Sequence, residues 1–566
     1  MQYTRSVRRA VFLALSLLSA CAATDAPLNG TDSAREEQST GPLGHFLAGR
    51  FALTEADPAV AAKESLRALA QAPNEPEVLQ QAFIASIAAE HPDAIALARR
   101  LPTNLAAQLL LADDDLRAER WAEAEKRYHA LPREGLSQLL QPLLVAWAQQ
   151  GGGRTDAALQ TLRPFVENPR MRGIFSLHAG LIADIANRPE DAARYFRPLL
   201  TDAADSDLRL AQILASWQER NQHQADARRI LATVGERSPE IGIALRDLLA
   251  TLSERPVKNP ADGVAEAYVA LAGALRAQEQ PEAALLMLHL ALRVRPTFAM
   301  ARLQEAEIHA GRKHYPLAVR ALELIADNDP LIVMARLRRA ALLDRMDRRD
   351  EAIAALQGLA AEHPESRLPD LQLGDIFRSQ KRFDDAIAAY TRAIARIDKP
   401  VRSDWLVYYE RGVAYERSNR WPLAEADLKL ALELSPGQPF VLNYLAYSWA
   451  DMGRNLDKAR EMLQQAAAVR KDDGAVTDSL GWVMLRQGDI VGAVHMLEHA
   501  VELEPQDATI TDHLGDAYFA AGRTIEARYQ WKRALTLDPA ADDVAKLEEK
   551  LKKGPAASGA GKSPRP

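Results

Sequence analysis

Small and large apolar positions recur along this chain with a period of 34 residues. The unit that begins at Ala508 shows the pattern most clearly, at Gly515, Tyr518, Ala527, Trp531, Ala534 and Pro539. Apolar positions three or four residues apart place one face of a helix against a partner, and small residues let two helices approach closely. Proline ends the second helix because it lacks an N–H group. Each unit is therefore predicted to be two antiparallel helices joined by a tight turn.

The same six positions are filled one period earlier by Gly481, Met484, Ala493, Leu497, Ala500 and Pro505. Further units begin at 439, 405, 367, 333, 299 and 265, with insertions of four residues at about 401–404 and of one near Asn455. These positions resemble the signature of the tetratricopeptide repeat (TPR). The resemblance implies an all-α fold, a TPR α-solenoid superhelix with a concave groove.

The N-terminal half is a weaker copy of the pattern. Units begin near 105, 139, 173 and 208, and residues 41–104 have room for two more. Residues 241–264 break the register, and the stretch SERPVKNPADG (253–263) is rich in proline and glycine. We predict a degenerate array over 41–250, a linker over 251–264, eight repeats over 265–541, a charged terminal helix over 542–553 and a disordered tail over 554–566. That makes about 13–14 helix pairs in two arrays.

The first 20 residues have the layout of a signal peptide. Arg5, Arg8 and Arg9 precede the short apolar stretch 10–18. The following LSAC resembles the lipobox of bacterial lipoproteins, which implies cleavage before Cys21 and lipidation of its thiol. The alternative is an ordinary signal peptide with an incidental cysteine.

Residues 22–40 are small and polar, and are expected to form a flexible tether with an r.m.s. reach of about 25 Å. Ala22 and Ala23 follow the cysteine where an aspartate would favour the inner membrane. We therefore expect a lipid-anchored protein of the bacterial outer membrane that faces the periplasm.

Charge and cysteine content limit the classes of partner. The formal net charge is −7 and no long basic run follows the first ten residues, so we expect no nucleic-acid partner. Cys21 is the single cysteine of the chain, which rules out an intramolecular disulfide.

The sequence HMLEH (495–499) has the His-x-x-Glu-His spacing of a zinc-peptidase motif. His495 and His499 would lie one turn apart on a helix, with Glu498 as the base. They fall, however, at positions of a second repeat helix that vary between units. A third metal ligand is missing, and so are neighbouring groups that would orient the ligands. HPD (91–93) falls in a turn, and GAGKS (559–563) lacks the first glycine of a phosphate loop. We therefore expect no catalytic residue, metal or cofactor, although an enzyme with a cryptic site stays an alternative.

The remaining candidate site is the groove of the last four units. First-helix positions that line the concave face of such repeats hold ten aromatic, acidic or amide residues here: Tyr409, Glu416, Phe440, Asn443, Tyr447, Asp478, Trp482, Asp512, Asp516 and Phe519. Aromatic and acidic side chains on an inner surface suit an extended or helical peptide. The alternative is that some of them, notably Trp482, pack between repeats.

A more specific resemblance covers residues 443–485 and 510–535, beginning NYLAYSWADMG and ITDHLGDAYFAAG. This region is similar to bacterial TPR lipoproteins typified by the lipoprotein binding partner of the carboxyl-terminal processing protease. The resemblance implies a non-catalytic adaptor that brings a periplasmic serine protease to peptidoglycan hydrolases. An assembly or export factor, such as a pilotin-like helper for pili, exopolysaccharide or outer-membrane proteins, is the alternative.

Overall fold

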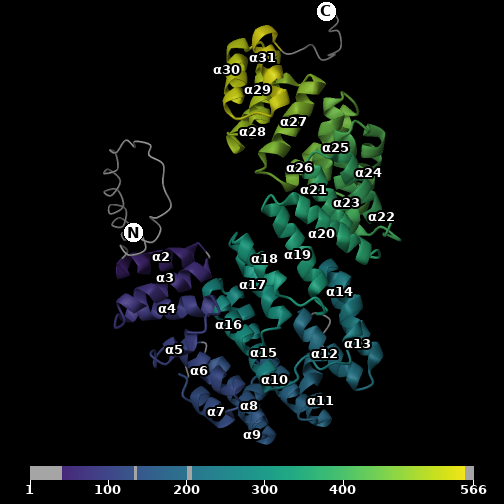
Figure 1. Cartoon of the computed structure of the whole chain (residues 1–566). Coiled ribbons are helices and arrows are strands. Elements are labelled where there is room, and N and C mark those ends of the chain that lie inside the picture. The colour runs from purple at the N-terminus through teal and green to yellow at the C-terminus, as the bar shows by residue number, and fades with distance from the viewer. Residues whose placement is uncertain (1–40, 56, 133–134, 136, 201–206, 555–566) are drawn as a thin grey trace, which may run out of the picture. The chain divides into compact units, whose positions relative to one another are not determined.

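A computed structural model describes residues 41–554 except 56, 133–134, 136 and 201–206 (Figure 1). The predicted signal peptide, Cys21, the predicted tether and residues 555–566 of the predicted tail lie outside the described residues. The helices, in chain order, are α2 (Pro42–Thr54), α3 (Pro58–Gln71), α4 (Pro76–Ala88), α5 (Ala94–Ala98), α6 (Leu105–Arg117), α7 (Trp121–His129), α8 (Ser137–Gly151), α9 (Thr155–Glu167), α10 (Arg172–Ile185), α11 (Pro189–Leu200), α12 (Leu208–Arg220), α13 (Gln224–Arg237), α14 (Pro239–Ala250), α15 (Pro260–Ala277), α16 (Pro281–Val294), α17 (Ala299–Gly311), α18 (Tyr315–Glu323), α19 (Ile332–Arg345), α20 (Arg349–Glu362), α21 (Leu368–Ser379), α22 (Phe383–Ile394), α23 (Trp405–Arg417), α24 (Trp421–Leu434), α25 (Pro439–Asp451), α26 (Leu456–Val469), α27 (Gly474–Gln487), α28 (Ile490–Leu503), α29 (Ala508–Ala520), α30 (Thr524–Thr536) and α31 (Ala541–Lys553). A short 3₁₀ turn, Arg402–Asp404, precedes α23. The all-α fold predicted from the sequence is confirmed.

The chain divides into two compact units, residues 1–148 and 149–566. Each is described by itself below. In the first unit, α2 packs on α3, α3 on α4, and α6 on α7. In the second unit, paired helices continue from α10 with α11 to α29 with α30 (Figure 1).

The turn inside most units places one residue at positive φ. These residues recur about every 34 positions, with φ between 53° and 85°: Glu90, Glu119, Gly153, Asn187, Gln222, Glu279, Lys313, Asp347, Lys381, Asn419, Gly453, Gly488 and Gly522. A left-handed residue ends a helix and reverses the chain sharply. Glycine adopts this conformation without steric cost, yet most of these turns use another residue. The tight helix packing of each unit therefore imposes the conformation.

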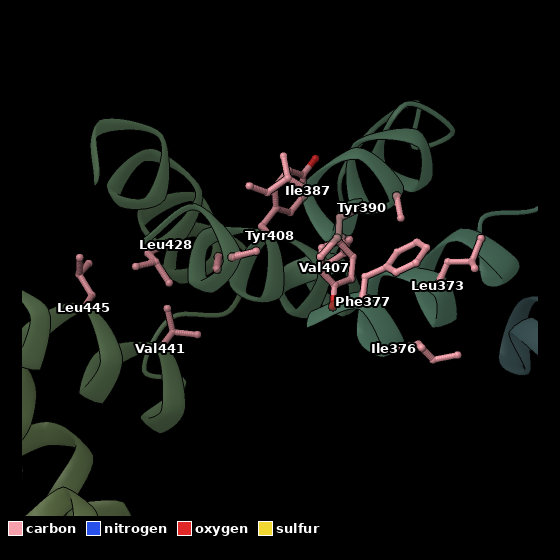
Figure 2. Close-up of a cluster of buried hydrophobic side chains, with 14 of the residues drawn as sticks. Leu373, Ile376, Phe377, Ile387, Tyr390, Val407, Tyr408, Leu428, Val441 and Leu445 are labelled. Carbon is pink, nitrogen blue, oxygen red and sulfur yellow. The ribbon is translucent and has the colours of Figure 1, made fainter. Parts of the chain in front are cut away.

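Within a unit, a glycine on the first helix lies against a large residue on the second. A Cβ at Gly515 would collide with the Trp531 ring, and one at Gly374 with the Tyr390 ring. Trp531 and Tyr390 are both almost fully buried. Tyr390 belongs to a buried apolar cluster that extends from α14 to α27, part of which is drawn in Figure 2, and Trp531 belongs to a second cluster formed by α28 to α31. A single unit could not bury this much apolar surface, but stacked units can.

Helix α14 changes the predicted boundary of the first array, which was placed at residue 250. Ile243 of α14 is 4% exposed and belongs to the same buried cluster as Val333 and Leu337 of α19. Arg338 of α19 donates to Glu240 at the start of α14. Helix α14 thus packs on α13 of the predicted first array and also on α19 and α21 of the predicted second array.

The predicted linker, 251–264, is shorter in the structure and is packed. Helix α15 begins at Pro260, and the Asn259 side chain caps it by accepting from the amide of Asp262. Proline suits the first position of a helix, since its missing N–H would be unpaired there. Both Arg209 and Arg295 donate to the carbonyl of Pro256. A cavity of about 400 Å³ lies beside this segment.

Candidate functional site

The ten predicted residues lie on four first helices of the second unit. Tyr409 and Glu416 are on α23, Phe440, Asn443 and Tyr447 on α25, Asp478 and Trp482 on α27, and Asp512, Asp516 and Phe519 on α29. Helix α27 packs directly against both α25 and α29. We call the surface formed by these ten residues the first-helix face.

A histidine that the sequence analysis did not single out lies at the centre of this face. His513 of α29 is 6% exposed, and its Nδ1 lies 2.9 Å from both carboxylate oxygens of Asp478. The ring of Trp482 stacks on the imidazole at 4.2 Å between centroids, and the Tyr447 ring lies 6.2 Å away. Trp482 therefore packs between repeats, as the alternative interpretation expected.

The electrostatics around His513 favour its charged form. Burial by itself would lower the pKa of the imidazole, but the charge of Asp478 and its hydrogen bond outweigh burial and raise the pKa above the ordinary value. Asp512 and Asp516 add to this increase. Asp478 and His513 thus form a buried ion pair that links α27 to α29.

The other two predicted acids bind a lysine of the terminal helix. Lys550 of α31 places its Nζ 2.7 Å from Asp512 and 2.8 Å from Asp516. Asp516 also accepts a hydrogen bond from Trp531 at 3.1 Å. Burial raises the pKa of the Asp516 carboxyl, and the nearby charge of Asp512 raises it further. Asp478, Asp512 and Asp516 therefore all contact a cation of this chain, with two cations for the three acids, which weakens the expected attraction for basic peptides.

The α23 end of the face is an aromatic pair with one acid. Tyr444 of α25 meets Tyr409 edge to face at 5.8 Å between centroids and donates to Glu416 at 2.9 Å. Burial raises the pKa of Tyr409 to about 12, so its hydroxyl stays protonated at neutral pH. Both tyrosines can thus donate hydrogen bonds but cannot supply a negative charge.

Two buried polar atoms on the face have no hydrogen-bond partner among the described residues. They are Oδ1 of Asn443 and Nε1 of Trp482, one acceptor and one donor on neighbouring helices. Phe440, 50% exposed, and Phe519, 37% exposed, present apolar surface on α25 and α29. Buried polar groups are normally paired, so Asn443 Oδ1 keeps an unused capacity to accept a hydrogen bond and Trp482 Nε1 an unused capacity to donate one.

The spacing of these contacts is a signal that could have been found in the sequence. Asp478 and His513 are 35 residues apart, Tyr409 and Tyr444 also 35, and Asp516 and Lys550 34. Each separation is close to one repeat, so equivalent positions of adjacent first helices face each other. Opposite charges spaced in this way are candidates for contacts between repeats.

The HMLEH stretch lies on α28. His495 is exposed, His499 lies 3.4 Å from Glu502, and Glu498 accepts from the Tyr518 hydroxyl at 2.7 Å. Three or more histidine, cysteine or acidic residues grouped to hold a metal ion occur nowhere in the part of the chain that the structure describes. Glu498 binds a tyrosine here, and its role as a general base has no support in this geometry.

Comparisons with known proteins agree with the repeat pattern. A family model described as a tetratricopeptide repeat-like domain matches residues 255–407, and one described as a tetratricopeptide repeat matches residues 479–542. A TPR repeat-containing protein of Pseudomonas aeruginosa is 33% identical over 95 residues, which is 17% of this chain and 16% of that protein. The chain therefore matches only a small part of this relative's length.

Several solved structures match the chain at low TM-scores. The APC/C hetero-tetramer Cut9-Hcn1 is 14% identical, with a TM-score of 0.37 over 92% of this chain and 98% of that one. A TPR protein of Parabacteroides merdae is 14% identical, with a TM-score of 0.34 over 51% and 97% of the two chains. A MamA protein is 23% identical, with a TM-score of 0.26 over 34% and 98%. The two family matches identify tetratricopeptide repeats in residues 255–407 and 479–542, and the same paired-helix arrangement continues in the helices around them.

Proposed function

We propose that the protein is a non-catalytic adaptor whose first-helix face binds a segment of a protein partner. The TPR architecture supports protein partners in general. The observation that supports this face is the pair of unpartnered polar atoms, Asn443 Oδ1 and Trp482 Nε1. A peptide backbone offers one N–H donor and one C=O acceptor per residue, and these match the two atoms.

The charges of the first-helix face indicate which side chains the bound segment needs. Because His513 and Lys550 already contact three of the acids and offset most of their charge, the bound segment needs no large excess of basic side chains. The exposed rings of Phe440 and Phe519 favour apolar side chains on it. We infer that backbone hydrogen bonds and apolar contacts dominate the binding energy.

The proposed partner is a periplasmic carboxyl-terminal processing protease, to which the adaptor delivers peptidoglycan hydrolases. The test is quantitative capture of that protease from envelope extract by purified protein. Trp482→Phe should weaken capture about tenfold, since it removes the indole N–H and keeps a ring that stacks on His513. Asn443→Leu should act in the same direction, because it removes the acceptor.

A matched control is Trp421→Phe. Trp421 Nε1 is also buried, but it lies on α24, a second helix, beside Glu425. This change should leave capture unaltered. Equal loss with both tryptophan changes would reject the first-helix face, and capture of pilus or export components in place of the protease would assign the protein to assembly or export.

We further propose that the protein is held at the outer membrane by lipid on Cys21. The described helices include none that is long and apolar enough to span a bilayer, so a covalent lipid would supply the attachment. Cys21→Ser should release the protein into the soluble fraction, and mass spectrometry of the wild type should find acyl chains on Cys21. Wild-type protein that has no lipid and still sediments with membranes would contradict the anchor.

A further inference from the structure

Helix α2, the first described helix, exposes a row of large apolar side chains. Leu43, Leu47 and Phe51 are 68%, 54% and 65% exposed. They follow one another at four-residue intervals, so they share one face of the helix. The opposite face packs against the protein and buries His45, Gly49 and Ala52. Helix α2 therefore buries one face against the protein and leaves a second, apolar face exposed to water. Helices that are apolar on both faces are normally covered on both.

Charges of both signs flank the apolar row of α2. The sequence of Pro42–Thr54 has no acidic residue, and exposed Arg50 lies one turn from Leu47. Glu55, which directly follows the helix, is exposed and lies one turn from Phe51. The exposed apolar row, and not the charge, is therefore the feature of α2 that fits a membrane surface.

The length of chain before α2 supplies the second argument. Nineteen residues, 22–40, separate Cys21 from the start of the described structure, and their composition predicts an r.m.s. reach of about 25 Å. A lipid on Cys21 would therefore keep α2 at the membrane surface at high effective concentration. This step rests on the proposed lipid anchor.

We propose that α2 is a second membrane-binding element, which lies on the lipid surface with Leu43, Leu47 and Phe51 inserted among the headgroups. The bound helix would fix the orientation of the first unit on the membrane, whereas a flexible tether by itself would leave the orientation free. The partner chemistry is the surface of a lipid bilayer.

The second unit offers a matched apolar set for comparison. Val491 of α28 and Ile525 and Tyr529 of α30 are 85%, 82% and 65% exposed. Those helices also contain Glu498, Glu502 and Glu526, and they lie far along the chain from Cys21. Chain position favours α2 as the lipid-facing set.

The test is flotation with vesicles of phosphatidylethanolamine and a minor share of phosphatidylglycerol. The protein is the chain from residue 21 onward, which keeps every described residue, with Cys21→Ser so that no lipid is attached. The triple change Leu43→Ser, Leu47→Ser and Phe51→Ser should weaken vesicle partitioning by at least about tenfold. The triple change Val491→Ser, Ile525→Ser and Tyr529→Ser should leave it within about twofold.

Two results would overturn the proposal. Equal flotation of the α2 variant and the parent, or no flotation of the parent, would remove α2 as a membrane element. A parent dimer that becomes monomeric only in the α2 variant, measured by light scattering, would assign the row to a second copy of the chain. The protein in the flotation test carries Cys21→Ser and therefore has no lipid. A missing acyl chain on Cys21 of the native protein would reject the lipid anchor but would not decide the role of α2. The failure of the anchor and the failure of the proposal for α2 are therefore distinguishable.

Discussion

The first and last described helices finish the chain's repeats in opposite ways. Helix α31 buries Leu547, 1% exposed, against α30 and binds two acids of α29 through Lys550, while its outer positions are charged. Helix α2 leaves Leu47 54% exposed. A repeat array needs a polar outer surface at its ends to stay soluble, and α31 meets that need where α2 does not.

The comparison teaches that the same element, a helix at the edge of a stack, can stabilise the fold or present a surface. Leu547 and Leu47 are chemically identical, but only Leu547 is removed from water in the folded chain. Their contributions to the free energy of unfolding should therefore differ by several kcal/mol. The predictions below test this difference, from the largest expected effect to the smallest.

Leu547→Asp should have the largest effect. A carboxylate in place of a buried leucine loses the apolar contacts and must be desolvated or expose the helix interface, at a cost of about 3–5 kcal/mol. Hydrogen exchange should show lost protection in α29, α30 and α31, with more distant repeats little changed. Unchanged protection in α31 would mean that this helix does not stabilise the array.

Lys550→Gln should have the next largest effect. It leaves Asp512 and Asp516 close together without their cation, and Asp516 is largely buried, so we expect a loss of about 1–3 kcal/mol in urea unfolding. The matched control is Lys546→Gln on the same helix. Lys546 binds Asp543 with its side chain 68% exposed, so this loss should stay below about 0.5 kcal/mol. Equal losses would show that helix propensity, and not the buried pair, sets the stability.

The buried pair of Asp478 and His513 should make the stability of the last repeats depend on pH. The pKa of His513 is raised in the folded chain above its usual 6.5, so the pair's contribution is fully present below about pH 6.5 and is lost as the pH rises through the raised pKa. Urea unfolding of the wild type and His513→Gln should differ most on the acid side, by about 1 kcal/mol, and converge at alkaline pH. His499→Gln, at an exposed histidine, should show no such convergence.

Leu47→Asp should have the smallest effect on folding, within about 0.5 kcal/mol of wild type, because the side chain is already half in water. Circular dichroism and urea unfolding measure it directly. A loss as large as that of Leu547→Asp would mean that α2 is covered by another part of the chain, and it would remove the contrast between the two ends.

Much of the fold was predictable because its periodicity lies in the sequence. Gly515 against Trp531 and Gly374 against Tyr390 follow from small and large residues at fixed positions of one unit. Such contacts are local, so the pattern of residue size predicts them. The end of the first array was predicted less well, since α14 has the same kind of apolar face as the repeat helices but packs on α19, some 98 residues away.

The candidate site was predicted only in outline. The repeat register placed Asp478, Trp482 and Asp512 on neighbouring first helices, and they do lie there. The net charge of this group of residues could not be predicted from each position alone, because Asp478 is paired with His513 and Asp512 with Lys550. Whether the face binds a partner stays a prediction, and the unpartnered atoms of Asn443 and Trp482 are the means to test it.

The sequence by itself determined the helices, their pairing within units and the period of the stack, because these depend on which residues are small, large or apolar along one segment. Only the tertiary structure decided which polar groups meet across repeats. Lys550 could have pointed into water, but it lies between Asp512 and Asp516. The energy of a charge depends on the atoms that surround it in space, and those atoms come from other helices whose distance and orientation a residue pattern does not contain.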